Sequence, residues 1–322
     1  MPRGISVVVP CYNSEGSIGL LVEALRPVLA TLAPAFEIIL VDDASRDGTA
    51  KVIADLARRH DDVSAVTLMR NYGQHAALLC GIRAARYDVT ITMDDDLQHP
   101  PDELPRLVSA LTDDLDVVYG SAAEEPHGFL RGIASRITKR VLRDAMGVAT
   151  AGNASAWRVF RTRLRDAFDE FRGSFVSIDV LLTWGTQRFT SIKVRHDPRT
   201  IGSSNYTLRK LLVHAINMMT GFTSIPLRLA SWLGFALTAF GAVILVFVLG
   251  RYLIDSSSPP GFPFLACIIA VFSGAQLLCL GIIGEYLGRA HFRLLDRPPY
   301  QVRTSTGGGP GSGGEPTSAP SG

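Results

Sequence analysis

Three consecutive acids, Asp94 to Asp96, follow the apolar run Val89–Met93, and Gln98 comes two residues later. The run has the length and composition of a buried strand, so these oxygen-bearing side chains are delivered at a strand end. Carboxylate and amide oxygens suit Mg²⁺ or Mn²⁺, and a cation held there would bind a diphosphate. The alternative is a solvated acidic loop, because short acidic motifs are common.

Further polar clusters follow further strand-like runs. Strands are expected at residues 6–9, 37–41, 64–68, 89–93 and 116–119, with helices near residues 17–32, 49–59, 74–85 and 101–111. This alternation predicts an α/β domain with a parallel sheet covered by helices on both faces. Ligands of such sheets bind beyond the carboxyl ends of the strands, so the clusters that follow the first four strands should share one rim. These clusters are residues 10–13, 42–49, 70–73 and 94–98.

The residues of these clusters are expected to have different roles. Asp42 or Asp43, directly after a hydrophobic strand, could accept hydrogen bonds from a base or ribose. Asp47 is read as part of a turn and helix start. Arg70 could offset the acids or bind a phosphate. His75 and His99 are interpreted as surface or capping residues rather than metal ligands.

Two long uncharged segments, residues 229–249 and 261–284, lie in the C-terminal third of the chain. Each reaches the length of about 20 residues that crosses a bilayer, so they predict transmembrane helices at 229–250 and 261–287, joined by a short extracytoplasmic loop at 251–260. A pair of buried core helices is the alternative. Basic residues gather on the side that both termini share, which predicts cytoplasmic termini. They are Arg209, Lys210, Arg228, Arg289, Arg293 and Arg297.

The remaining segments complete the predicted organisation. Residues 1–205 should form a cytosolic domain, since residues 5–9 are too short for the apolar part of a signal peptide. Residues 206–228 alternate apolar and basic side chains, which predicts an amphipathic helix in the membrane interface; an ordinary linker helix is the alternative. Residues 288–322 are expected to be a cytosolic tail, disordered after about 303 because Gly, Ser and Pro dominate.

The composition argues against an ordinary soluble enzyme and against a nucleic-acid-binding protein. Hydrophobic residues make up 47% of the 322 positions and charged residues 19%, which is more apolar than an ordinary soluble enzyme. A net charge of +2 does not favour nucleic acid. The four cysteines have neither disulfide nor metal spacing, so they are expected to pack as apolar residues.

With these motifs the chain resembles the inverting glycosyltransferases of family two with the GT-A fold, and within them the polyprenyl-phosphate glycosyltransferases. That group includes dolichyl-phosphate mannose synthase and the bacterial undecaprenyl-phosphate glucosyl- and aminoarabinosyltransferases. The resemblance spans residues 5 to about 300. Its motifs lie at residues 9–13, 41–49, 70–73, 93–101, 199–204 and 281–287, together with the two predicted spans.

The resemblance implies a set of site residues. Asp94 and Asp96 would form the acid pair, with Asp96 and Gln98 on a bound Mg²⁺ or Mn²⁺. Arg131 and Ser135 would contact phosphate, and Arg199 would begin the loop that closes on the donor diphosphate. The stretch around Arg131 could instead lie on anionic lipid headgroups. The implied donor-binding set is Pro10, Tyr12, Asn13, Asp42, Asp43, Arg70, Asp94 and Arg199.

Two departures from the family pattern bear on the chemistry. Members often carry Gly-Ser-Arg where this chain has Gly-Ser-Ala, ending at Ala122. Some members carry an acid, proposed as the catalytic base, where this chain has Ala156. A lipid phosphate is already ionised near pH 7, because its second pKa is about 6, so its oxygen can attack without giving up a proton. Asp179 is retained as a candidate base.

The resulting hypothesis is a membrane enzyme that moves a sugar from a UDP- or GDP-sugar to a polyprenyl phosphate. Transfer would invert the anomeric centre at the cytosolic face of a bacterial-type plasma membrane, and the chain could form a homo-oligomer. A processive polysaccharide synthase is one alternative, but Gln187-Arg188-Phe189 does not fit the expected Gln-x-x-Arg-Trp motif and two spans are few for a polymer channel. A non-catalytic scaffold or sugar-nucleotide sensor is the other.

Overall fold

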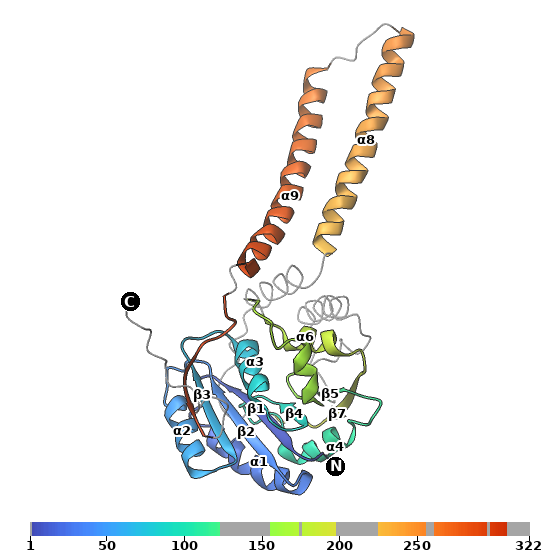
Figure 1. Cartoon of the computed structure of the whole chain (residues 1–322). Helices are drawn as coiled ribbons and strands as arrows, with labels where there is room; N and C mark the ends of the chain where they lie inside the picture. Colours follow the sequence, from blue (N-terminus) through green and yellow to red (C-terminus); the bar gives the residue numbers. More distant parts are fainter. Residues whose placement is uncertain are drawn as a thin grey trace, which may run out of the picture. The chain divides into compact units, whose positions relative to one another are not determined.

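The computed structural model describes residues 2–122, 155–173, 176–197, 225–255, 261–294 and 297–307 (Figure 1). It consists of two compact units. One comprises Met1–Leu208 together with Arg297–Gly322, and the other comprises Arg209–Asp296. The C-terminal residues of the chain therefore belong to the same unit as the N-terminal domain.

The first unit is built on one eight-stranded sheet in the order β7-β5-β6-β4-β1-β2-β3-β8. Strands β4, β1, β2 and β3 are parallel, but β6 runs antiparallel to both β4 and β5, and β8 runs antiparallel to β3. The sheet is therefore mixed, which corrects the expectation of a purely parallel one. The strands are β1 (Ile5–Cys11), β2 (Phe36–Asp42), β3 (Val63–Leu68), β4 (Val89–Thr92), β5 (Val117–Ala122), β6 (Arg158–Arg161), β7 (Phe189–Val194) and β8 (Val302–Thr306).

Helices cover both faces of the sheet, as the sequence predicted. Along β1, alternate residues such as Val7 and Val9 join the core beneath α1 (Ile18–Leu32), α2 (Thr49–Arg59) and α4 (Leu104–Ser109). The opposite face carries α3 (Gln74–Ala84), where Gly81 lies so close to Val8 that an added Cβ would be 2.3 Å from its Cγ1. Period-two alternation in β1 thus supplies an apolar residue to each layer.

Two short elements complete the second layer beside α3. They are η3 (Thr162–Ala167), a 3-10 helix, and α6 (Ile178–Gly185), and both contact α3. A further 3-10 turn, η1 (Pro101–Glu103), leads into α4 on the other face. The helix expected at 101–111 is therefore real but shorter, beginning as a 3-10 turn after Pro100 and ending at Ser109.

The C-terminal strand β8 adds to the outer edge of β3. Thr304 pairs with Thr67, the Met69 N–H donates to the Gln301 carbonyl at 2.8 Å, and Arg303 donates to the Met69 carbonyl at 2.9 Å. The expectation of disorder after about residue 303 is therefore wrong for residues 303–307. Backbone pairing with an exposed sheet edge orders this segment without requiring apolar side chains.

The second unit contains two long helices, α8 (Ile225–Asp255) and α9 (Phe262–Leu294), which contact each other. Their windows Leu227–Ile244 and Val271–Gly288 are long and apolar enough to cross a membrane, and at most 6% of either window is buried. Such exposure argues against the core-helix alternative. The helices extend beyond the predicted spans, and α8 continues through part of the predicted loop to Asp255.

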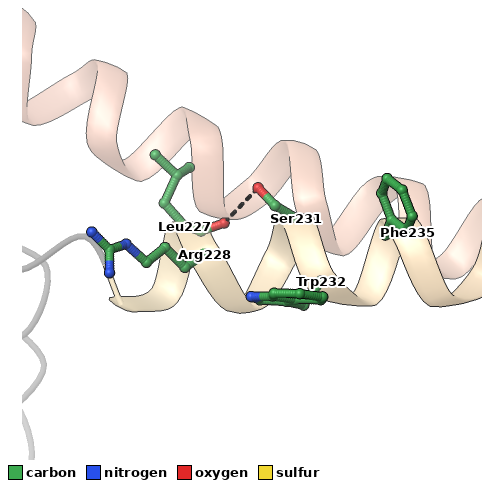
Figure 2. Close-up of a pocket in the computed structure, with 5 residues that line it drawn as sticks. All are labelled: Leu227, Arg228, Ser231, Trp232 and Phe235. Atoms are coloured by element: carbon green, nitrogen blue, oxygen red, sulfur yellow. Dashed lines mark hydrogen bonds between the residues drawn. The ribbon is translucent and has the colours of Figure 1, made fainter.

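The start of α8 carries a mixed set of side chains (Figure 2). A cavity of about 550 Å³ is lined there by Leu227, Arg228, Ser231, Trp232 and Phe235. The Ser231 hydroxyl donates to the Leu227 carbonyl at 3.0 Å. An arginine and a tryptophan near a helix end are typical of the membrane–water interface. Residues 225–228 of the predicted interfacial segment thus belong to α8, and residues 206–224 lie outside the described residues.

Candidate active site

The polar clusters predicted from the sequence meet at one edge of the sheet. Cys11 at the end of β1 pairs with Asp42 at the end of β2, and Val8 pairs with Thr92 at the end of β4. Because these strands are parallel and in register, the loops that follow them emerge side by side. The shared rim is therefore present in the structure.

The three consecutive acids have different surroundings. Asp95, the middle one, accepts hydrogen bonds from the Ser14 hydroxyl and from the Tyr12 N–H, the latter at 3.4 Å. Burial raises the pKa of Asp95, although these two donors oppose the shift. Asp95 thus ties the loop after β4 to the loop after β1, which leaves the acids on either side of it as the candidate pair.

Asp94 and Asp96 are each oriented by neighbours. Gln74 Nε2, at the start of α3, donates to Asp94 Oδ1 at 2.6 Å, and the Gln98 N–H donates to Asp96 Oδ1 at 3.2 Å. Leu97, between Asp96 and Gln98, has a φ of 61°, a left-handed conformation that a leucine adopts only when its surroundings impose it. The loop therefore has a single defined turn.

This donor set suits a divalent cation that is shared with a substrate. Within the described ranges, no three His, Cys, Asp or Glu side chains gather closely enough to hold a metal by themselves. Mg²⁺, however, is commonly bound by one or two carboxylates plus substrate phosphates rather than by an all-protein cage. Asp94, Asp96 and the Gln98 amide match that pattern, and a diphosphate would supply the remaining ligands.

At the end of β2, as after β4, one acid is tied to a neighbouring loop while the other keeps an oxygen available. Asp43 accepts from the Tyr72 and Gly73 N–H groups, each at 2.7 Å, and burial raises its pKa against the effect of these two bonds. It therefore fixes the loop after β3. Asp42 accepts from the Ser45 N–H at 3.1 Å, while its buried Oδ2 has no hydrogen-bond partner among the residues described.

The loop after β1 is tied to the loop after β2. Asn13 has a φ of 56°; its N–H donates to Ser45 Oγ and its Oδ1 accepts from the Arg46 N–H, both at 2.9 Å. Pro10 is buried within β1, opposite Val41, whereas the Tyr12 side chain is exposed at the rim. Asp47 accepts from the Thr49 N–H at 3.1 Å at the start of α2, which is the turn role predicted for it.

Two further predicted residues lie near the same rim. Arg70 places its guanidinium 4.8 Å from the centre of the Tyr72 ring, and its side chain is exposed. His75 Nδ1 accepts from the N–H of Ile178, the first residue of α6, at 3.3 Å, as a capping residue would. Arg131, Ser135 and Arg199 lie outside the described residues.

The prediction that His99 is a surface or capping residue is wrong. Its side chain is buried, with its ring stacked on Trp157 at a centroid distance of 4.9 Å. Burial, assisted by His196 and Arg158, lowers the His99 pKa to about 4, although Asp96 acts in the opposite direction. The imidazole is therefore neutral at physiological pH.

A buried polar network lies beside this loop. Arg158, at the start of β6, pairs through two hydrogen bonds with Asp179 on α6 and donates to Thr92 Oγ1 at 3.2 Å. Tyr119 also donates to Asp179, at 3.0 Å. Burial raises the pKa of Asp179, but the charge and hydrogen bonds of Arg158 outweigh it and lower the pKa overall. A carboxylate held in this way is a poor general base, which argues against that role for Asp179.

Sequence reasoning missed several residues of this site. Ser14 and Gln74 orient acids at the rim, and Arg158 pairs with the buried Asp179. Each of these residues comes from a segment remote in sequence from the acid it contacts. A capping or turn signal cannot reveal such partners. The Arg in Ala156-Trp157-Arg158 was visible in the sequence, but nothing in the sequence pairs it with Asp179.

Comparison with known proteins decides the family. The profile described as Glycosyl transferase family 2 matches residues 6–171, which include β1 from its second residue, β2 to β6 and every rim loop described above. The chain belongs to glycosyl transferase family 2. It is therefore a glycosyltransferase, and the predicted fold class is confirmed: a GT-A-type α/β domain followed by two long apolar helices.

Curated relatives extend the similarity over nearly the whole chain. A Yersinia enterocolitica protein named undecaprenyl-phosphate 4-deoxy-4-formamido-L-arabinose transferase is 34% identical over 95% of this chain and 94% of its own length. A Pseudomonas aeruginosa protein of the same name is 36% identical over 92% of this chain and 89% of its own length. These relatives are undecaprenyl-phosphate sugar transferases by name.

Solved structures match more distantly. Glucosyl-3-phosphoglycerate synthase from Mycobacterium tuberculosis, in a complex with Mn²⁺, uridine diphosphate and glucosyl-3-phosphoglycerate, is 19% identical with a TM-score of 0.48, covering 68% of this chain and 78% of that chain. Mannosyl-3-phosphoglycerate synthase from Rubrobacter xylanophilus is 18% identical with a TM-score of 0.47, covering 66% of this chain and 72% of that one.

Proposed function

We propose that this family 2 enzyme transfers a sugar from a nucleotide diphosphate sugar to a polyprenyl phosphate, with inversion at the anomeric carbon and with a requirement for Mg²⁺ or Mn²⁺. The observation that carries the proposal is the meeting of Asp94, Asp96 and Asp42 at one rim, in a chain that also has two exposed apolar helices. Relatives named undecaprenyl-phosphate transferases support the acceptor class.

Donor binding is assigned to the rim formed at the ends of β1, β2, β3 and β4. The buried Oδ2 of Asp42 has no hydrogen-bond partner in the part of the chain that the structure describes, and it would accept from a donor group of the base or ribose. An unpaired buried carboxylate oxygen costs free energy until it accepts a hydrogen bond. Asp94, Asp96 and Gln98 would hold the cation. When bound, that cation supplies positive charge to the leaving diphosphate. Arg70 and Arg199 are the candidate arginines for the diphosphate oxygens.

Acceptor activation needs no strong base in this scheme. A lipid phosphate has a second pKa of about 6 and is ionised at physiological pH, so its oxygen can attack directly. Asp179, paired with Arg158, keeps a buried network in place instead of removing a proton. A single displacement from the face opposite the leaving diphosphate inverts the anomeric centre. Catalysis then rests on positioning and charge neutralisation, with Arg131 and Ser135 proposed for the acceptor phosphate.

The membrane arrangement belongs to the same proposal. Helices α8 and α9 would each cross the bilayer, and the distribution of basic residues supports a topology with both termini and the active site at the cytosolic face. Arg228 and Trp232, at the start of α8, are the residue types that settle at a membrane–water interface (Figure 2). An acceptor with an apolar tail would remain in the bilayer while its phosphate reached the rim.

The two alternatives are less well supported. A processive polysaccharide synthase would need a channel for the growing polymer, and the described residues contain only two helices that could span a membrane. A non-catalytic sensor is disfavoured by family membership and by acids whose oxygens are held at the rim by specific hydrogen bonds.

The test uses full-length enzyme in liposomes with undecaprenyl phosphate and a panel of radiolabelled UDP- and GDP-sugars, with and without a chelator. One donor should label the lipid, the chelator should stop transfer, and NMR of the product should show the anomer opposite to that of the donor. Transfer to a growing glycan instead of to lipid phosphate would overturn the acceptor assignment. Unchanged turnover in excess chelator would overturn the metal requirement.

A matched pair of variants tests the assignment of the acids. Asp96→Asn should abolish metal-dependent transfer and weaken Mn²⁺ binding by at least about tenfold while the fold is kept. Asp95→Asn should chiefly destabilise the loops after β1 and β4, because Asp95 contacts Tyr12 and Ser14. Full activity of Asp96→Asn would contradict the proposal.

A further inference from the structure

Three aromatic rings from separate segments meet behind the loop of Asp94–Gln98. We name His99, Trp157 and His196 the ring cluster. His99 stacks on Trp157 at 4.9 Å with the planes 28° apart, and His196 meets the His99 ring edge-on at 5.0 Å and 87°. The rings follow β4, precede β6 and follow β7 respectively, so the cluster joins three strand ends.

The ring cluster is attached to both ends of the loop that carries the candidate metal ligands. At one end, the Asp94 N–H donates to His99 Nδ1 at 3.4 Å. At the other, the N–H of Asp197, next to His196, donates to the Gln98 carbonyl at 3.0 Å. Gln98 Nε2 also approaches the Asp197 carbonyl, at 3.5 Å. The loop is therefore held at its first and last residues by groups that belong to, or adjoin, the cluster.

The loop needs such support. Leu97 occupies the left-handed region, which a non-glycine residue keeps only where contacts from its surroundings offset the strain. Trp157 is fully buried and provides a rigid surface for the His99 ring. The His99 side chain is buried, and its Nδ1 accepts the hydrogen bond from the Asp94 N–H.

We propose that the ring cluster is a positioning unit for the cation site: His99 sets the backbone of Asp94, and the His196–Asp197 segment sets that of Gln98, so that Asp94, Asp96 and Gln98 converge on one divalent cation. His99, Trp157 and His196 are positioning residues rather than ligands. The inference rests on the metal dependence in the proposed function. It adds that the affinity for the cation also depends on residues outside the acid motif.

Two variants of the full-length enzyme separate the two contributions of His99, its hydrogen-bond acceptor and its stacking ring. His99→Phe keeps a stacking ring but removes the acceptor, whereas His99→Asn keeps an acceptor near the position of Nδ1 and removes the ring. His60→Phe is the matched control, because His60 is a half-buried histidine that follows α2, at the end of the domain away from the rim. Two readouts are measured: Mn²⁺ affinity with nucleotide diphosphate present, by calorimetry, and amide hydrogen exchange of residues 94–98 in metal-free protein.

His99→Phe should weaken Mn²⁺ binding by about 10- to 100-fold and speed exchange of the Asp94 amide, and His99→Asn should recover part of the affinity. His60→Phe should change neither. Unaltered affinity and exchange in His99→Phe, or equal losses in His60→Phe, would overturn the inference. If the wild type bound no Mn²⁺, metal dependence would fail, and the exchange rates alone would still show whether His99 holds the loop.

Discussion

Arg158 and Asp179 form a buried, two-point ion pair, with Nε 2.7 Å from Oδ1 and Nη2 2.9 Å from Oδ2. Both side chains are almost fully enclosed, and Tyr119 and Thr92 satisfy further polar atoms of the pair. The pair occupies the neighbourhood of Ala156, where some family members are expected to carry an acid. It therefore bears directly on whether this enzyme uses a base.

Asp179→Asn should cost about 3–5 kcal/mol of unfolding free energy, because it leaves the Arg158 charge buried without its partner. The double variant Arg158→Met with Asp179→Leu should be less destabilised than Asp179→Asn alone. Denaturant unfolding of the detergent-solubilised protein measures both. The rate of sugar transfer by the folded fraction of Asp179→Asn should fall only modestly. A loss of four orders of magnitude with stability and donor binding unchanged would instead identify Asp179 as a base.

Substitutions of the two acids at the end of β2 should separate an effect on stability from an effect on donor binding. Asp43→Asn should lose about 1–3 kcal/mol of stability, since one amide oxygen cannot replace a carboxylate that accepts from Tyr72 and Gly73. Asp42→Asn should keep the Ser45 contact and the stability, but lower nucleotide affinity by about tenfold, or about 1.4 kcal/mol. Thermal unfolding and calorimetric titration with nucleotide diphosphate would distinguish them. A loss of stability in Asp42→Asn and a loss of nucleotide affinity in Asp43→Asn would show that the two roles are assigned the wrong way round.

The pKa of His99 predicts a pH dependence of stability. Its pKa is about 4 in the folded protein and about 6.5 in an unfolded chain, so folding disfavours the protonated form. The stabilising contribution is complete above about pH 6.5 and is lost as the pH falls towards 4, by about 3 kcal/mol in all. Asp96, Arg158 and His196 are the charged or titratable neighbours.

His99→Phe cannot take up this proton and should show a correspondingly smaller loss of stability between about pH 7 and about pH 4.5. Denaturant midpoints at both pH values measure the difference, with His60→Phe as the control that keeps His99. Parallel pH profiles for wild type and His99→Phe would show that the imidazole is not buried in the way described.

The C-terminal strand provides a truncation test. A chain ending at Gln301 loses β8 and uncovers the edge of β3, so the thermal midpoint of the catalytic unit should fall by several degrees and aggregation should rise. A chain ending at Gly307 keeps β8 and is the matched control. Equal midpoints for the two truncations would mean that β8 contributes nothing to the sheet.

Local signals in the sequence predicted the first half of the fold. Strands β1 to β4 and helices α1 to α3 follow apolar runs bounded by clear turn residues, and the observed bounds lie within a few residues of those expected. The sequence also predicted the rim, because parallel strands send their following loops to one edge. The family motifs and the two apolar segments were equally visible.

The elements that were missed have weaker local signals. Strand β6 is four residues long and contains two arginines, and β8 is mostly polar with a single large apolar residue, Val302. Such segments become strands because a neighbouring edge offers hydrogen-bond partners, not because of their own hydrophobic pattern. The antiparallel insertion of β6 between β4 and β5 therefore could not be predicted from alternation alone.

The sequence by itself determined which side chains reach the rim, and the tertiary structure decided what each of them does there. Asp42 and Asp43 are adjacent, as are Asp94, Asp95 and Asp96, and no local pattern separates their roles. Their partners, Tyr72 for Asp43 and Ser14 for Asp95, lie 29 and 81 positions away in the chain. Burial and hydrogen bonding between segments so distant in sequence arise only when the sheet has formed, because its register brings those loops together.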